Sequence, residues 1–352
     1  MLFLVAFFSL IGLVVLHELG HFLMAKKFGV RVEEFGIGLP PRLFGKKIGE
    51  TLYSLNLLPL GAFVKLTGEE GQSKDPRSFS QRSLLQRAFI IGAGVAAFWV
   101  IAFLIFFALA ATTGIPSSVS DEATGKVLNP QVRILGIAAS SPAKEAGLQV
   151  GDRVKDFARI GEFQSFIEQN KGKEIVLEIV RGKDSLSIPL VPRLEPPEGQ
   201  GPLGIQLVRT GNMQYSWYEA PAAAFQKTAG LTFDIAKSLA LTLKGVFQGK
   251  GLPQGVDVVG PIGILDLLRN SFSFGIGHFF SFLAVLSVYL ALFNALPIPA
   301  VDGGRLLFLG IEAARRKPMG AVIEQRINTF FFVLLITFMI WVTLKDITRL
   351  FS

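Results

Sequence analysis

The residues best suited to chemistry form the pentapeptide His-Glu-Leu-Gly-His, from His17 to His21, near the end of an apolar run that begins at Leu2. In an α-helix, residues four apart differ by about 40° around the axis, so His17 and His21 project from one face, one turn apart. Two neutral imidazoles placed in this way can bind one zinc ion. Glu18 lies about 100° round from His17, where a carboxylate can take a proton from a water molecule that the metal activates.

An alternative is that these three side chains sit together by chance, as satisfied polar groups of a buried helix. In hydrocarbon, each ionisable group without a task costs about 2 to 3 kcal/mol or more, which disfavours a chance cluster. The sequence has no cysteine, so a metal site here has to combine histidine with carboxylate ligands. We therefore expect a Zn²⁺ site with His17 and His21 as ligands and Glu18 as a general base.

The composition indicates a membrane protein. Of the 352 residues, 50% are hydrophobic and 32 are Phe, which is too apolar for an ordinary soluble enzyme. The net charge of +8 comes from basic residues dispersed among acidic ones, so we interpret them as topology signals and expect no nucleic-acid partner. Four apolar runs are long enough to cross a lipid bilayer, within residues 1–25, 88–113, 277–302 and 330–350.

The distribution of lysine and arginine predicts the orientation of these spans. Basic residues are frequent in segment 26–87 and recur in segment 303–329, which places both on the cytoplasmic side. The N- and C-termini and residues 119–207 are then extracytoplasmic. His17 lies about 22 Å along its helix, so we expect the metal inside the hydrocarbon layer and nearer to the cytoplasmic face.

Segment 26–87 is predicted to contain a membrane-associated β-hairpin or small sheet. Residues 30–37 and 51–66 include β-favouring runs, and the Pro-containing stretch 38–42 and a Gly-Lys-Lys turn at 45–47 separate them. An open edge of this sheet could accept an extended peptide as an added strand and present it to the metal. A hairpin that only connects two spans is the alternative.

Residues 119–207 differ sharply from the spans and predict a soluble α+β domain, because apolar and polar residues alternate and Gly and Pro mark turns. Within it, residues 140–152 predict a short capped helix that ends at Gly147 and a tight turn. This run resembles a PDZ domain. The resemblance implies a groove helix at 163–168 and a carboxylate-binding loop, and it leaves open whether the domain binds a C-terminus or acts only as a steric filter. The loop residues are Leu203, Gly204 and Ile205.

Segment 212–275 is predicted to be an amphipathic segment of the outer membrane surface, with an amphipathic helix between Tyr215 and Gly251 and a short segment that begins at the Gly-Pro-Ile-Gly-Ile motif. His278 after it is predicted to be an ordinary interfacial histidine. Two prolines and two glycines then interrupt the third span between Asn294 and Gly304. Non-helical backbone at membrane depth is tolerated only where it is buried in protein or lines a water-filled cavity. We expect Asp302, the carboxylate in this break, to be the third zinc ligand. The alternative is that Asp302 caps a helix that begins at Arg305.

Together these features predict a mainly α-helical polytopic membrane protein with four transmembrane helices, an inserted β-hairpin and an extracytoplasmic PDZ-like domain. His-Glu-Leu-Gly-His in the first span, Gly-Pro-Ile-Gly-Ile at 260–264 and Asn-x-x-Pro-x-Pro-x-x-Asp-Gly-Gly at 294–304 are similar to motifs of the site-2 protease family of intramembrane zinc metalloproteases. The similarity covers essentially the whole chain and points to the bacterial branch that includes the sigma-E regulator protease. Val301, Ala62 and the single PDZ-like domain depart from the usual pattern.

The resemblance implies an endopeptidase of the bacterial inner membrane that acts in regulated intramembrane proteolysis. Its substrates would be single-span membrane proteins, such as anti-sigma factors or signal-peptide remnants, which an upstream protease trims first. His17, His21 and Asp302 would hold Zn²⁺, and Glu18 would be the catalytic base. Asn294 would contact the substrate, and so would the hairpin, through Gly61 and Phe63.

Two other classes of function are compatible with parts of the sequence. A membrane scaffold with a PDZ domain and a vestigial metal motif is disfavoured because Glu18 and Asp302 are both intact. A zinc-dependent transporter is disfavoured because the two halves of the chain show no internal repeat, although broken helices are typical of transporters.

Overall fold

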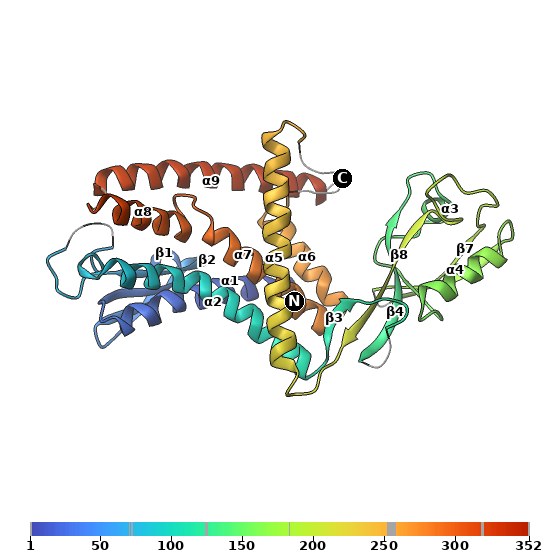
Figure 1. The fold of residues 1–352 in the computed structure, drawn as a ribbon, viewed down its shortest axis with the longest axis horizontal. Helices are drawn as coiled ribbons and strands as arrows, with labels where there is room; N and C mark the ends of the chain where they lie inside the picture. The colour runs from blue at the N-terminus through green and yellow to red at the C-terminus, as the bar shows by residue number, and fades with distance from the viewer. Residues whose placement is uncertain are drawn as a thin grey trace. The chain divides into compact units, whose positions relative to one another are not determined.

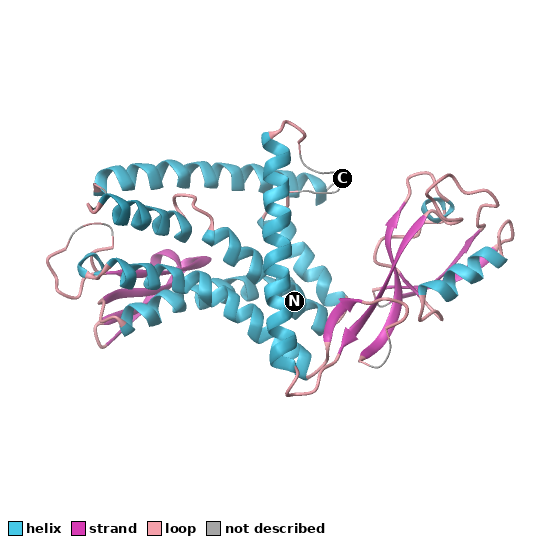
Figure 2. Cartoon of the chain, in the orientation of Figure 1, coloured by secondary structure: helices cyan, strands magenta, loops and turns pink. Residues whose placement is uncertain are grey.

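The computed structural model describes residues 2–69, 71, 73–123, 126–182, 184–251, 258–317 and 320–350. The chain forms two compact units. The first comprises residues 1–105, 225–270 and 282–352, and the second comprises residues 106–224 and 271–281. Figure 1 follows the elements along the chain, and Figure 2 shows that the strands gather in two separate places, the hairpin and the larger sheet.

In the part of the chain that the structure describes, four helices are long and apolar enough to cross a membrane, as expected. They are α1 (Leu2–Lys27), α2 (Leu84–Ala111), α7 (Ile276–Ala295) and α9 (Ala321–Leu350), and the mean hydropathy of their most apolar windows is 2.0 to 2.6. Apolar residues lie all round these helices rather than along one stripe, which is typical of helices that lipid surrounds. Helix α9 starts at Ala321, earlier than the apolar run alone indicates, because the polar residues that precede the run continue the same helix.

The hairpin consists of β1 (Val32–Ile48) and β2 (Thr51–Leu66), joined by a turn at Gly49 and Glu50. Residues 34–37 occupy its centre, since they pair on one side with residues 62–65 and on the other with residues 52–55. The expected turn at 45–47 is wrong, because these residues belong to β1, whereas the expected break at 38–42 coincides with a change in the strand pairing. After a bend at Gly38, residues 42–48 pair with 51–56, and this pairing outweighs the local turn signals.

Helix α1 meets the hairpin and α2 in one apolar core, which is formed by Ala25, Val30, Val32, Leu66, Phe79, Ile90 and Ile91. The two helices approach closely where α1 carries Gly20. A Cβ atom there would lie 2.5 Å from the Ala93 carbonyl oxygen and 2.9 Å from the Ala97 Cβ. Small residues therefore set the separation of α1 and α2, as is common between membrane helices.

Helix α8 (Asp302–Arg315) begins directly after the broken segment, at Asp302 rather than at Arg305. Val301 is its N-cap residue, so the alternative role of Asp302 as N-cap is wrong. The helix start packs tightly against the preceding loop. A Cβ atom on Gly303 would lie 2.0 Å from the Leu296 carbonyl oxygen, and one on Gly304 would lie 2.3 Å from the Ile298 carbonyl oxygen.

Among its described residues, segment 212–275 contains two helices, α5 (Ala220–Phe247), which lies within the expected helical stretch, and α6 (Pro261–Ser273). Residues 252–257, between them, lie outside the described residues. Helix α6 starts at the Gly-Pro-Ile-Gly-Ile motif, where the buried Asp346 carboxylate of α9 accepts hydrogen bonds from the N–H groups of Gly260 (3.2 Å) and Gly263 (2.8 Å). This carboxylate satisfies backbone donors that a helix N-terminus otherwise leaves unpaired.

The second unit contains a six-stranded sheet with the strand order β3-β8-β4-β5-β6-β7. Its elements are β3 (Ile115–Ser118), β4 (Val127–Ile137), α3 (Pro142–Glu145), β5 (Arg153–Val154), α4 (Ile160–Gln169), β6 (Ile175–Arg181), β7 (Asp184–Leu190) and β8 (Ile205–Met213). Ser141 caps α3 by accepting from the N–H of Lys144, and Gly147, with φ +77°, follows the helix. The sheet extends beyond residues 119–207, because Ile115 pairs with Met213.

Candidate metal centre

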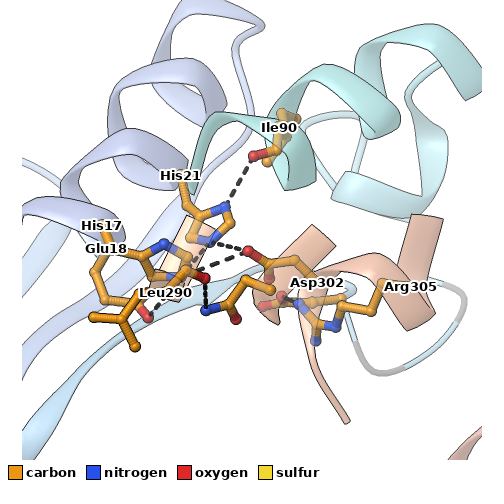
Figure 3. Close-up of polar contacts among 9 residues, drawn as sticks. His17, Glu18, His21, Ile90, Leu290, Asp302 and Arg305 are labelled. Atoms are coloured by element: carbon orange, nitrogen blue, oxygen red, sulfur yellow. Dashed lines mark hydrogen bonds and ion pairs between the residues drawn. The ribbon is translucent and has the colours of Figure 1, made fainter. Parts of the chain in front are cut away.

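Helices α1 and α8 bring three potential metal ligands together, as Figure 3 shows. The Nε2 atoms of His17 and His21 are 3.3 Å apart. The Oδ2 atom of Asp302 lies 3.5 Å from Nε2 of His17 and 3.3 Å from Nε2 of His21. The exposed fraction of these side chains is only 8% to 12%, so bulk water has little access to their polar atoms.

The triangle has the dimensions of a zinc site. Zinc–ligand bonds of about 2.0 to 2.1 Å in a tetrahedral arrangement separate neighbouring ligand atoms by about 3.3 Å. In addition, Oδ2 of Asp302 is buried and accepts no hydrogen bond. A buried carboxylate oxygen without a donor is costly unless a cation satisfies it. The two histidines and Asp302 therefore fit a Zn²⁺ ion and leave a fourth position open.

Neighbouring residues of α2 orient the two histidine rings so that their Nε2 atoms can bind a metal. Nδ1 of His21 lies 2.9 Å from the Ile90 carbonyl oxygen on α2, so this nitrogen carries the proton and Nε2 keeps its lone pair for a metal. The His17 ring stacks on Phe98 with a centroid distance of 4.4 Å. Gly94 of α2 faces both rings, and a Cβ atom there would lie 2.2 Å from Nε2 of His21.

Glu18 lies beside the ligand triangle, with Oε1 4.0 Å from Nε2 of His17. It lines a cavity of about 350 Å³ together with His21 and Asp302. The end of β2 forms another wall of this cavity, through Phe63, Val64, Lys65 and Leu66. Glu18 therefore shares one cavity with two of the three ligands and with the end of β2.

The other predicted site residues lie in different surroundings. Phe63 lines the cavity, whereas Gly61 lies earlier in β2 with φ +108°, and a Cβ atom on it would meet the Val14 side chain of α1 at 3.8 Å. Asn294 is the penultimate residue of α7, is half-buried, and donates from Nδ2 to the Leu290 carbonyl oxygen at 2.9 Å. Among the described residues, His278 does not belong to the metal-ligating group.

The predicted carboxylate-loop residues all belong to the second unit. Leu203 is buried, and Ile205 begins β8. Gly204 has φ +69°, and its N–H donates to the Gly201 carbonyl oxygen at 2.9 Å, which closes a turn. A Cβ atom on Gly204 would lie 2.5 Å from the Ser141 Cβ. The loop is thus sterically restricted to glycine at this position.

Sequence reasoning missed an ion pair in the same cavity. Arg305 follows Asp302 by one helical turn, and its Nη1 lies 2.5 Å from Oε1 of Glu69 in the segment after β2. The spacing of Asp302 and Arg305 could have placed both on one face of α8, since residues three apart are neighbours on a helix. Its partner could not be found in this way, because Glu69 is 236 residues distant in the sequence.

Comparisons with known proteins agree with this geometry. The sequence profile of Peptidase family M50 matches residues 5–338. A protein of Clostridium perfringens strain 13, named as a zinc metalloprotease, is 35% identical over 350 residues, which cover 96% of this chain and 95% of that protein. The zinc metalloprotease RasP of Shouchella clausii is 28% identical, over 99% of this chain and 98% of that protein.

The regulator of sigma-W protease RasP of Bacillus subtilis strain 168 is 27% identical, over 99% of this chain and 98% of that protein. The profile match covers nearly the whole chain, including both helices that carry the ligand triangle. The chain therefore belongs to peptidase family M50, the site-2 protease family, and is a zinc-dependent metalloprotease with the helices of an integral membrane protein.

Proposed function

We propose that the protein is an intramembrane endopeptidase that cleaves single-span membrane proteins within or near their transmembrane segments. The observation that carries the proposal is the position of the ligand triangle. Two of its three members, together with Glu18, lie on α1, a helix that is long and apolar enough to span a membrane. A metal site on such a helix acts on substrates that reach membrane depth.

We assign the metal to His17, His21 and Asp302, and the role of general base to Glu18. Zinc, when bound, supplies a Lewis acid that polarises the scissile carbonyl group and lowers the pKa of water to about 7. Glu18 takes the proton from the attacking water and later transfers it to the leaving amine, so the same carboxylate serves both proton transfers. His21 is held by the Ile90 carbonyl oxygen and keeps its orientation throughout.

The hairpin supports a route for the substrate. Residues 62–65 of β2 pair with β1 along one edge, and residues 63–66 line the cavity that contains Glu18. A helical substrate resists hydrolysis because its carbonyl groups are hydrogen bonded within the helix. We propose that it unwinds and adds to β2 as an extended strand, which presents a peptide bond to Glu18. Asn294 is proposed to contact this strand.

The larger setting follows from the charge pattern. We propose that the hairpin lies on the cytoplasmic side, that the sheet of the second unit is extracytoplasmic and that the membrane is the bacterial inner membrane. The sheet is proposed to be PDZ-like and to exclude substrates with bulky folded ectodomains until an upstream protease has trimmed them. Anti-sigma factors are suitable candidates for substrates, because one relative is named a regulator of sigma-W protease.

The Glu18→Gln variant tests the proposal. It removes the base but none of the three ligands, so it should keep bound zinc and lose cleavage, because a positioned base contributes about a hundredfold or more to the rate. The measurement is zinc content and cleavage of a single-span substrate, with full-length protein in lipid nanodiscs.

The matched control is Glu219→Gln, a change of the same kind at a carboxylate that pairs with Lys126 at 2.8 Å and does not line the cavity that contains Glu18. It should retain both zinc and cleavage. Cleavage by Glu18→Gln within about tenfold of the unmodified protein would exclude Glu18 as the base. Cleavage of soluble peptides with no action on the membrane-inserted substrate would exclude the intramembrane assignment.

A further inference from the structure

The short segment between α7 and α8 determines how Asp302 reaches the histidines. Ala300 has φ +80°, in the left-handed region that residues with a Cβ atom rarely adopt. Two residues later α8 begins with Asp302, and Gly303 and Gly304 leave no space between the helix start and the preceding loop. The backbone conformation at Ala300 therefore fixes the direction in which α8, and with it the Asp302 carboxylate, leaves the loop.

A side chain from α9 holds Ala300 in this conformation. The N–H of Ala300 donates to Oδ1 of Asn328 at 3.3 Å, across 28 residues of sequence. Asn328 is half-buried and, with Arg305, lines a second cavity of about 740 Å³. A strained backbone conformation persists only where its surroundings stabilise it, and here this hydrogen bond contributes to that stabilisation.

Helix α9 has few other buried contacts. Only 6% of the residues in its apolar span are buried, compared with 39% in α2. Apart from Asn328, the described polar contacts of α9 with other segments include those of Asp346 with Gly260 and Gly263, near the opposite end of the helix. The hydrogen bond between Asn328 and Ala300 therefore connects α9, a lightly packed helix, to the loop that precedes Asp302.

We propose that Asn328 is a positioning residue for Asp302, and that through it the placement of α9 controls the geometry of the zinc site. The side-chain oxygen of Asn328 accepts a hydrogen bond from the Ala300 N–H and so stabilises the backbone conformation of Ala300. That conformation determines the position of the Asp302 carboxylate. This inference rests on the proposed role of Asp302 as a ligand. It adds a fourth element, α9, to the α1, α2 and α8 segments that surround the metal.

Two nearly isosteric variants separate the hydrogen bond from the bulk of the side chain. Asn328→Leu removes the acceptor oxygen, whereas Asn328→Asp keeps an oxygen at the same place. Loss of a group that orients a ligand lowers metal affinity by about 10- to 100-fold, so Asn328→Leu should bind zinc at least about tenfold more weakly and Asn328→Asp within about threefold of the unmodified protein. Zinc affinity is measured by competition with a chelating indicator, using full-length protein that elutes as a single species.

Turnover provides a second readout. Asn328→Leu should lower kcat at saturating zinc and leave KM nearly unchanged, because the variant alters a ligand rather than a substrate contact. The control on the same helix is Thr337→Val, whose hydroxyl donates to the Val333 carbonyl oxygen of α9 itself at 2.8 Å. This control should change neither zinc affinity nor kcat.

Asp302→Ala distinguishes failure of this inference from failure of the proposed function. If Asp302→Ala loses zinc while Asn328→Leu binds it as tightly as the unmodified protein, the positioning role is wrong and the ligand set stands. Equal losses in Asn328→Leu and Asn328→Asp also overturn the positioning role, because the acceptor oxygen would then be irrelevant. Full zinc retention in Asp302→Ala overturns the ligand set itself.

Discussion

Asp302 and Asn294 lie on either side of the break between α7 and α8, and their side chains make different contacts. The Asp302 carboxylate completes a triangle of buried ligand atoms, with edges of 3.3 to 3.5 Å. The Asn294 amide donates to its own helix at Leu290 and touches no member of that triangle through a described hydrogen bond. The first side chain is suited to holding a metal, whereas we propose that the second contacts the incoming peptide.

Substitution at these two positions should therefore have different effects. Asp302→Ala leaves a two-histidine site and should lower zinc content and cleavage together, by about tenfold or more in affinity. Asn294→Ala should keep full zinc content and reduce kcat/KM for the single-span substrate. Metal analysis and cleavage assays on both variants check this, and zinc loss in Asn294→Ala would place that residue in the metal site instead.

At the scale of elements, the hairpin positions one aromatic wall of the cavity that contains Glu18. Phe63 of β2 packs across Gly36 of β1, where a Cβ atom would lie 2.3 Å from the Phe63 ring. Gly36 is also the Cα partner of Phe63 in the sheet. A glycine is required at this position because the ring occupies the space of a side chain.

Gly36→Ala should displace the Phe63 ring and lower kcat/KM by about tenfold or more, since misplacement of about 1 Å at a site can cost two orders of magnitude. Zinc content should remain full, because no ligand is displaced. The matched control is Gly92→Ala on α2, where a Cβ atom would meet no atom within 4 Å. If both variants cleave alike, β2 does not present the substrate.

At the scale of the whole molecule, the second unit forms a sheet whose first and last strands adjoin. Ile115 and Met213 are Cα partners in β3 and β8, so a short Gly-Ser linker can replace residues 115–213 and connect Gly114 to Gln214. Removal of 119–207 alone would leave β3 paired with the rest of β8 but would remove β4, the other neighbour of β8. The sheet boundary thus gives a cleaner deletion than the change in composition does.

If the second unit is a steric filter, this deletion should permit cleavage of an untrimmed substrate and leave cleavage of a trimmed one within about threefold, because the reacting groups are all on α1 and α8. If the second unit instead binds the new C-terminus of a trimmed substrate, the opposite result is expected. Trimmed-substrate cleavage would then fall on deletion, on Gly204→Ala, which distorts the loop beside Ser141, and on amidation of the substrate. A comparison of both substrates across these variants decides between the two roles.

The parts of this fold that could be predicted are those encoded by local pattern. The His17 to His21 spacing, the apolar spans and the helix cap at Ser141 each depend on residues within one or two turns. The strand from 42 to 48 could not be predicted, because its pairing with 51–56 outweighs proline and glycine signals that locally favour a break. The start of α8 at Asp302 was also missed, since Gly303 and Gly304 read as helix breakers but serve close packing.

The site contacts that could not be predicted join distant segments. Glu69 and Arg305 are 236 residues apart, and Asn328 acts on a backbone group rather than on a motif. No periodicity in the sequence marks such pairs. They depend on how α8 and α9 pack, which is a property of the folded chain.

Gly94 on α2 has no side chain, and this leaves space beside the two histidine rings of the candidate metal centre. A methyl group at this position would lie 2.2 Å from Nε2 of His21 and 2.5 Å from Cε1 of His17, in the space beside the coordinating nitrogens. Alanine, the smallest chiral residue, is therefore already too large. A single added carbon at Gly94 would occupy space beside the histidine nitrogens and interfere sterically with metal binding. All three proposed ligands and the proposed base would remain chemically unchanged.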